Sequence, residues 1–134
     1  MPIRTPTQEQ VDTLLQVADR DWEAAFSLMQ YAPHLYEGIG FHFQQAAEKY
    51  LKAALHVYGQ PAPFVHDLVS LATDLNPHVA FDADDISAAT VLTVFAVRLR
   101  YTLDNAPPYS VTDLLAMAER FRTKLRPLAQ AFLV

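Results

Sequence analysis

One stretch, from Gly40 to Gly59, constrains the fold of this chain more than any other. It reads GFHFQQAAEKYLKAALHVYG, and the triplet HDL follows it at His66–Leu68. Because side chains on a helix recur about every 3.6 residues, the stretch predicts a helix with two distinct stripes. The broad, apolar stripe contains Phe43, Ala47, Tyr50, Ala54 and Val57, widened by Leu51, Leu55 and Tyr58. The narrow, cationic stripe contains His42, Gln45, Lys49, Lys52 and His56. The first stripe predicts a buried face, and the second predicts either a solvated surface or a binding site.

The length and composition of the chain limit the class of protein. Its 134 residues are expected to form one domain, residues 1–134, with a hydrophobic core. It has no cysteine, which excludes disulfides and thiolate chemistry. The formal net charge of −5 argues against strong non-specific DNA binding, although a local basic patch stays open. No apolar run approaches about 18 residues, and the N-terminus lacks the apolar segment of a secretory signal. We therefore expect no membrane span and a cytoplasmic location.

Helical spacing and proline breaks divide the chain into five predicted helices. They are expected at about Gln8–Gln30, from Leu35 or Gly40 to Gly59, at Asp67–Leu75, at Ile86–Leu103, and from Ser110 onward. Thr7 is the predicted N-cap of the first helix, and Pro127 is predicted to kink or end the last one. The fourth segment also alternates like a strand, but its length of about 18 residues favours a buried helix. The pattern predicts an all-α fold, an up-and-down antiparallel bundle of four long helices plus one short helix.

Several classes of chemistry lack their sequence signatures. Five histidines suggest a metal site, but the chain has neither HExxH nor a Glu-x-x-His pair. His42 and His56 lie four helical turns apart, so they cannot share one ion. There is also no nucleophile elbow and no glycine-rich phosphate loop. We therefore predict no metal, no cofactor and no catalytic nucleophile.

The cationic stripe of the second helix is the first candidate site. Lys49 and Lys52 lie one turn apart, so the two ammonium groups can hold two phosphate oxygens. In the alternative, the stripe is a solvated face on which Glu48 pairs with Lys52 at the i, i+4 spacing.

A second candidate lies in the fourth predicted helix, where Arg98 and Arg100 interrupt an apolar run and Tyr101 follows. Arginines on a buried helix need a partner, because an unpaired buried charge is costly. The partner is either an internal carboxylate, which makes the group structural, or a second subunit or a phosphate.

Three features together resemble the HEPN domains, named for higher-eukaryote and prokaryote nucleotide-binding. They are the run Phe43–Ala53, the triplet His66–Leu68 and the pair Arg100-Tyr101. The resemblance spans essentially the whole chain and implies a helical bundle that is commonly dimeric. Many members accompany a minimal nucleotidyltransferase in a toxin–antitoxin or regulatory pair, and some are metal-independent ribonucleases.

The ribonucleases of this family carry an arginine followed, after four to six residues, by a histidine. This chain departs from that pattern, since the positions at that spacing hold Leu103, Asp104, Asn105, Ala106 and Pro107. Imidazole is the side chain normally poised to move a proton near neutral pH, so the resemblance implies binding rather than cleavage. The residues that it implies for nucleotide or phosphate binding are Lys49, Lys52, Arg98, Arg100, Tyr101, Gln45 and His66. Among them, Tyr101 is able to stack on a base.

Three functions stay open at this point. The first is a non-catalytic homodimer that binds a nucleotide, RNA or a nucleotidyltransferase partner. The second is a ribonuclease that uses Arg98 or Arg100 with a distant base, His66 or His42. The third is a purely structural dimerising bundle without a ligand.

Overall fold

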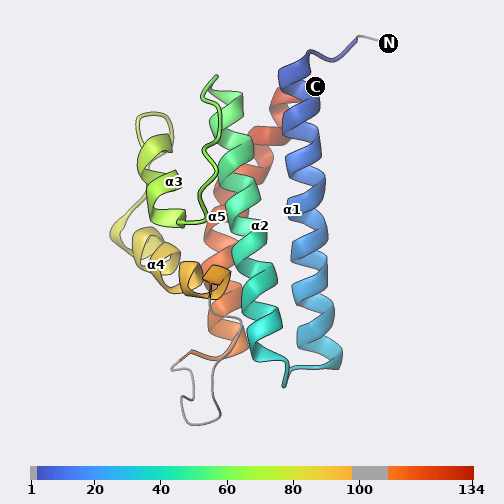
Figure 1. Ribbon diagram of the computed structural model, residues 1–134, viewed down its shortest axis with the longest axis vertical. Helices are drawn as coiled ribbons and strands as arrows, with labels where there is room; N and C mark the ends of the chain where they lie inside the picture. The colour runs from blue at the N-terminus through green and yellow to red at the C-terminus, as the bar shows by residue number, and fades with distance from the viewer. Residues whose placement is uncertain (1–2, 98–108) are drawn as a thin grey trace.

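The computed structural model describes residues 3–97 and 109–134. Within them the chain forms five helices and no strand, which confirms the all-α prediction (Figure 1). The helices are α1 (Pro6–Tyr31), α2 (Tyr36–Val57), α3 (Leu68–Leu75), α4 (Ala83–Val97) and α5 (Val111–Phe132). No helix among the described residues is both long enough and apolar enough to cross a membrane.

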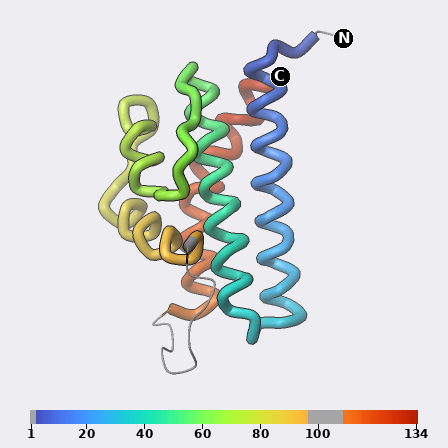
Figure 2. The backbone as a smooth tube through the Cα atoms, viewed as in Figure 1, coloured from blue at the N-terminus to red at the C-terminus, as the bar shows by residue number. Residues whose placement is uncertain are grey.

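Helix α2 is the centre of the bundle. Helices α1, α2 and α5 lie side by side along the long axis, and α1 runs opposite to the other two (Figures 1 and 2). Helices α3 and α4 lie on the side of α2 that faces away from α1. Helix α2 therefore contacts all four of the other helices. As a result 13 of its 22 residues are buried, and they include the polar residues Gln44, Glu48 and Lys52. The cationic stripe of α2 is thus partly covered, because each of its five residues is buried or half-buried, and it is not a fully solvated face.

The first helix begins earlier than the sequence pattern predicts. Its N-cap is Thr5 rather than Thr7, because Pro6 occupies the first helical position, where a missing N–H costs nothing. Gln8 closes the capping box. Its backbone N–H donates to Thr5 Oγ1 over 3.1 Å, and its side-chain Oε1 accepts from Thr5 N over 2.9 Å.

Three further helix ends, those at Gly59, Asp67 and Ser110, follow local rules. Gly59 adopts a positive φ of 75° directly after α2, as expected for a glycine that ends a helix. Asp67 caps α3, and Ser110 caps α5 with Asp113 as the reciprocal partner. Of the two effects predicted for Pro127, a kink or an end of the last helix, the end is wrong, since α5 continues to Phe132. Pro127 lies in the final turns, where it removes only one backbone hydrogen bond.

Helix α4 confirms the helical interpretation of its segment. Asp82 and Asp85 cap its start reciprocally, over 2.8 Å and 3.0 Å. Phe95 packs so closely on Gly40 that a Cβ atom there would lie 2.2 Å from the ring. Gly40 is therefore needed because α4 approaches α2 at this point. The predicted end of the helix at Leu103 lies outside the described residues.

A polar contact centred on Asp19 ties the three long helices together. The Tyr50 hydroxyl donates to Asp19 over 2.6 Å, and Arg126 donates two hydrogen bonds of 2.9 Å to the same carboxylate. Nearby, Trp22 is 9% exposed and packs against Phe43, with ring centroids 5.3 Å apart. These contacts join α1, α2 and α5 without involving the candidate site.

Candidate functional site

Glu48 is the centre of a polar cluster on α2. Its side chain is 0% exposed, yet it is an ionisable carboxylate in the middle of a bundle. One oxygen, Oε2, accepts from Lys49 Nζ at 2.7 Å and lies 3.2 Å from Lys52 Nζ. The other oxygen, Oε1, accepts from His66 Nδ1 at 2.7 Å and from Gln44 Nε2 at 3.2 Å. We call Gln44, Glu48, Lys49, Lys52 and His66 the Glu48 cluster.

The surroundings of Glu48 keep it ionised. Burial alone would raise the pKa of this carboxyl, because a low dielectric disfavours the charged form. Hydrogen bonds from Lys49 and His66, together with the charge of Lys49, outweigh burial and lower the pKa to about 2. An ionised carboxylate only accepts hydrogen bonds, so the Nδ1 proton of His66 points at Glu48. The opposite ring nitrogen, Nε2, is then left to interact with a ligand or solvent.

The cluster carries an excess of positive charge. One carboxylate faces two lysines, which leaves one positive charge without an internal counter-charge. The side chain of Lys49 is 21% exposed and that of Lys52 is 11% exposed, so neither is freely solvated. The His66 side chain is 62% exposed and adds a further positive charge when protonated. This arrangement suits the binding of an anion.

Two glutamine side chains hold the Glu48 cluster in place through hydrogen bonds. Gln44 Nε2 donates to the backbone oxygen of His66 at 3.0 Å, which holds the segment between α2 and α3 in place. Gln45 Nε2 donates to Gln44 Oε1 at 2.7 Å and does not line the pocket described below. Gln45 therefore orients Gln44 in this structure, one step removed from the lysines.

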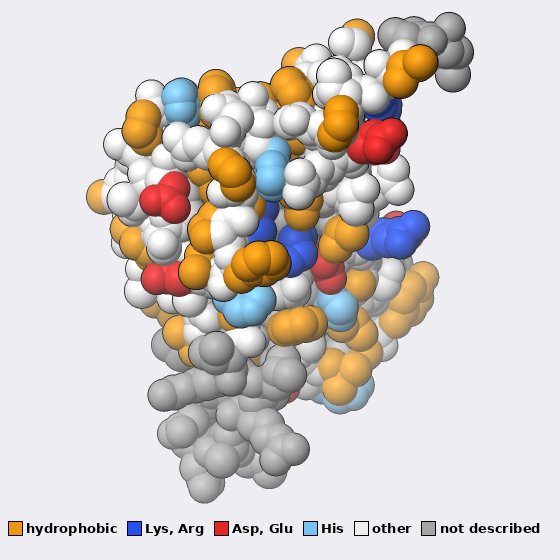
Figure 3. All heavy atoms as spheres, turned by 45° about the horizontal axis from the view of Figure 1, so that its top comes forward, with side chains coloured by type: hydrophobic (Ala, Val, Ile, Leu, Met, Phe, Trp, Pro, Cys, Tyr) orange, Lys and Arg blue, Asp and Glu red, His pale blue; other side chains and the backbone are white. Residues whose placement is uncertain are grey.

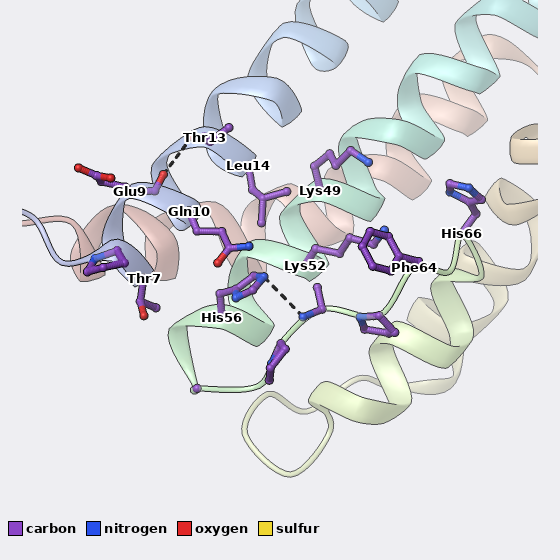
Figure 4. A pocket seen from close by; sticks show the side chains of 15 residues that line it. Thr7, Glu9, Gln10, Thr13, Leu14, Lys49, Lys52, His56, Phe64 and His66 are labelled. Carbon is purple, nitrogen blue, oxygen red and sulfur yellow. Dashed lines mark hydrogen bonds between the residues drawn. The ribbon is translucent and has the colours of Figure 1, made fainter.

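A pocket of about 1070 Å³ opens beside the cluster. Its walls come from α1, from the C-terminal half of α2 and from the connector between α2 and α3 (Figure 4). The residues that line it are Pro6, Thr7, Glu9, Gln10, Thr13, Leu14, Lys49, Lys52, His56, Gly59, Pro61, Ala62, Pro63, Phe64 and His66. In the space-filling view, cationic and histidine side chains gather in a hollow among apolar ones (Figure 3). The pocket therefore has a cationic wall and, across from it, a second wall whose inward side chains are uncharged, which we call the uncharged wall. The one acidic lining residue, Glu9, is exposed, and its carboxylate points away from the lysines (Figure 4).

His56 anchors the connector that forms one wall. Its Nε2 accepts a hydrogen bond from Ala62 N at 3.5 Å (Figure 4). Burial lowers the pKa of His56, which favours the neutral ring that can accept this bond. The connector is thus fixed to α2 at two places, through His56 and through Gln44.

The structure brings together only some of the residues predicted for the site. Lys49, Lys52 and His66 lie in one cluster, as described above. Arg98, Arg100 and Tyr101 lie outside the described residues. His42 pairs with Asp21 of α1 at 2.9 Å and lines no part of the pocket. Within the residues that the structure describes, no group of three or more histidine and carboxylate side chains is arranged to hold a metal ion.

Other residues of the site were missed by sequence reasoning. Helical spacing predicts Glu48 as a surface partner of Lys52 or as an internal partner of the arginines in the fourth helix, and not as the centre of the site. The spacing of Gln44 and Glu48 nevertheless places both on one side of α2. The uncharged wall includes Gln10 and Thr13 of α1 and Phe64 of the connector. No local pattern identifies these three residues, because only the packing of α1 on α2 brings them to the site.

Comparisons with known proteins agree with this architecture. The family model of the HEPN domain matches residues 11–128. The structure is similar to that of TT1696 from Thermus thermophilus, with a TM-score of 0.63 and 26% identity over 92% of this chain and 95% of that chain. It also has the fold of ST0689, an archaeal HEPN homologue, with a TM-score of 0.64 and 24% identity over 91% of this chain and 97% of that chain. None of the curated proteins compared with the sequence matches it. The family model covers most of the 134 residues, and the chain belongs to the HEPN domain family.

Proposed function

We propose that this HEPN domain is a non-catalytic module that binds the phosphate group of a nucleotide in the pocket beside Glu48. The observation that carries the proposal is the convergence of Lys49, Lys52 and His66 on one buried carboxylate at the wall of a large pocket. Glu48 holds both ammonium groups in fixed positions, so less side-chain entropy is lost when a ligand binds. The remaining positive charge then attracts the phosphate.

The size of the pocket supports a nucleotide over a simple anion. A volume of about 1070 Å³ is slightly above the roughly 300–1,000 Å³ typical of small-molecule sites. Inorganic phosphate would fill a small part of it. A nucleotide would reach from the lysines to the uncharged wall.

Thermal unfolding with and without adenosine 5′-monophosphate tests the proposal. A ligand that binds only the native state raises Tm with increasing concentration. We expect such a rise in the wild type and a clearly smaller one in Lys49→Gln. Arg20→Gln is the matched control, because Arg20 is exposed on α1, lies outside the pocket and changes the net charge equally. No rise in the wild type at millimolar nucleotide would refute nucleotide binding.

The family resemblance adds partners to this proposal. A minimal nucleotidyltransferase would bind the module in a toxin–antitoxin type pair, and the module would itself form a homodimer in the cytoplasm. Arg98, Arg100 and Tyr101 are proposed to add phosphate and base contacts. Light scattering should then give twice the 15.0 kDa mass of one chain. A small nucleotidyltransferase encoded next to this gene should co-purify with it when the two are co-expressed, and separate elution would contradict this part.

One contact favours a second candidate function, metal-independent RNA cleavage. His66 Nδ1 lies 2.7 Å from the ionised Glu48, an arrangement that orients a histidine so that its other ring nitrogen can act as a base. In such a reaction His66 Nε2 would take the proton of a ribose 2′-hydroxyl. Cleavage of RNA by the purified protein, abolished in His66→Gln, would establish this function. Absence of cleavage together with nucleotide binding would leave the binding function.

A further inference from the structure

We infer that Phe64 is the surface on which the base of the bound nucleotide stacks. This inference rests on the proposed function and names the residue that makes the pocket select a nucleotide over other phosphates. Phe64 lines the pocket, yet its side chain is 103% exposed. A fully exposed phenyl ring contributes nothing to the core of the protein, and its two faces are open to a ligand.

The neighbours of Phe64 in the connector face the core, and this directs the Phe64 side chain outward. Ala62 and Val65 are partly buried and pack against the hydrophobic core, whereas Phe64 between them projects from the chain. The connector, residues 58–67, contains Pro61 and Pro63, which restrict its backbone. The ring is therefore presented to the pocket on a stiff support.

Hydrogen bonds fix this support on both sides of Phe64. Before it, Ala62 N donates to His56 Nε2 at 3.5 Å. After it, the backbone oxygen of His66 accepts from Gln44 Nε2 at 3.0 Å. The second bond comes from the Glu48 cluster itself, so the phosphate-binding end and the aromatic end of the pocket are built on one framework. Figure 4 shows Phe64 and His66 on the same connector, facing the side on which Lys49 and Lys52 lie.

The two ends suit the two halves of a nucleotide. Lysines hold phosphate as point charges, and stacking of a base on an aromatic side chain is worth about 1–3 kcal/mol, whichever base it is. A ribose phosphate without a base would use only the first end. The pocket is therefore expected to favour nucleotides over sugar phosphates and to discriminate weakly among bases.

Calorimetric titration with two ligands tests this inference. The wild type should bind adenosine 5′-monophosphate at least about fivefold more tightly than ribose 5-phosphate. In Phe64→Ala this preference should shrink clearly, because only the nucleotide loses a contact, while the base contact proposed for Tyr101 remains. Phe64→Trp should keep the preference, since it keeps the aromatic face. Tyr31→Ala is the control, because Tyr31 is another exposed aromatic residue, 80% exposed at the end of α1 and outside the pocket.

A spectroscopic signal gives an independent test of stacking. The fluorescence of 2-aminopurine riboside 5′-monophosphate is expected to be quenched on binding to the wild type and to stay bright with Phe64→Ala at saturation. Equal affinity of the wild type for the two phosphates, or an equal loss of both in Phe64→Ala, would overturn the role of Phe64 while leaving phosphate binding intact. Failure of both phosphates to bind the wild type would overturn the proposed function as well.

Discussion

Two carboxylates are buried in the described part of the protein, and a comparison of their surroundings separates a site from a structural contact. Glu48 on α2 is 0% exposed and Asp85 on α4 is 1% exposed. Each receives two cationic side chains, Lys49 and Lys52 for Glu48, and Arg120 and Lys124 of α5 for Asp85.

The two clusters differ in the sign of their charge. Around Asp85, Arg120 lies 3.7 Å from Asp82 and 3.8 Å from Asp84, so three carboxylates face two cations. This cluster has an excess of negative charge. Its hydrogen bonds form the N-terminal cap of α4 and join that cap to Arg120 of α5. The Glu48 cluster has a positive excess.

The cavities beside the two clusters differ as well. The hollow at Asp85 has a volume of about 430 Å³, and α5 forms nearly all of its wall. The pocket at Glu48 has about 1070 Å³ and is walled by three segments of the chain. Burial of a paired carboxylate therefore does not by itself indicate a binding site. We propose that the excess of one charge at the wall of a large pocket is the feature that distinguishes a binding site.

The largest difference is expected from neutralising each carboxylate. Glu48→Gln leaves two lysines close together without their counter-charge, and removing one partner of a buried ion pair typically costs about 3–5 kcal/mol. Asp85→Asn should cost roughly 1 kcal/mol, because Asp82 and Asp84 still face Arg120, Lys124 keeps its hydrogen bond to the backbone oxygen of Ala80, and the amide oxygen can keep the cap. Urea unfolding measures both free energies.

Phosphate should then separate the two variants. Inorganic phosphate supplies the missing negative charge only at the Glu48 cluster, so it should raise the stability of Glu48→Gln more than that of the wild type. Its effect on Asp85→Asn should equal that on the wild type. Equal rescue of both variants would show that the anion acts non-specifically.

Acid should remove the contribution of Glu48 next. Its pKa is about 2 in the folded protein against 4.5 as the ordinary value, so the native state binds fewer protons than the unfolded state. The resulting stability, roughly 3 kcal/mol from that difference, is present above about pH 4.5 and is lost as the pH falls toward 2. Unfolding free energies measured between pH 6 and pH 3 should therefore fall more steeply in the wild type than in Glu48→Gln. Parallel curves would contradict the ionised state of Glu48.

His66→Gln should have an intermediate effect that has no equivalent at Asp85, where no histidine takes part. The substitution removes a charge-assisted hydrogen bond from a largely exposed side chain, so stability should fall by about 1 kcal/mol. Nucleotide affinity should fall by roughly threefold to tenfold, measured by calorimetry. An unchanged affinity would remove His66 from the ligand site and leave only its contact with Glu48.

The smallest effect is expected at the connector. Burial lowers the pKa of His56, so its neutral form and the bond to Ala62 persist above the ordinary value of 6.5 and weaken as the pH falls below it. The contribution of His56 to the free energy of unfolding therefore increases with pH, and it should stay within about 1 kcal/mol. The protection factor of the Ala62 amide, which is its exchange corrected for the intrinsic pH dependence, should fall by up to about fivefold from pH 7.5 to pH 5.5. Protection factors within the Asp85 cap should stay constant over the same range.

The local features of the fold could be predicted from the sequence. The apolar stripe of α2, the start of the last helix at Ser110 and the stop at Gly59 depend on residues close in the chain, and the structure confirms them except for Tyr58, which is exposed. Asp67, predicted as the first residue of the third helix, is the cap that precedes it. The shift of the first cap from Thr7 to Thr5 shows how one proline moves a helix start.

The site could be predicted only in part. Lys49 and Lys52 were identified from helical spacing, but the spacing could not show that Glu48 is fully buried between them and His66. The α1 wall of the pocket depends on contacts between distant segments, for which the sequence holds no periodic signal. The stripe that the spacing predicts as a solvated face or a binding site is, because of its burial, a cluster with fixed geometry.

The central claim is that the positive excess at Glu48, and not cationic residues in general, binds a nucleotide. Calorimetric titration of adenosine 5′-monophosphate into the wild type, Lys52→Gln and Lys124→Gln tests it most directly, because each variant removes one lysine from one of the two clusters. We predict that Lys52→Gln raises Kd by about tenfold, as expected for the loss of one charged hydrogen bond, and that Lys124→Gln leaves Kd within about twofold of the wild type. Nucleotide binding that survives Lys52→Gln unchanged, or that both substitutions weaken equally, would contradict the claim.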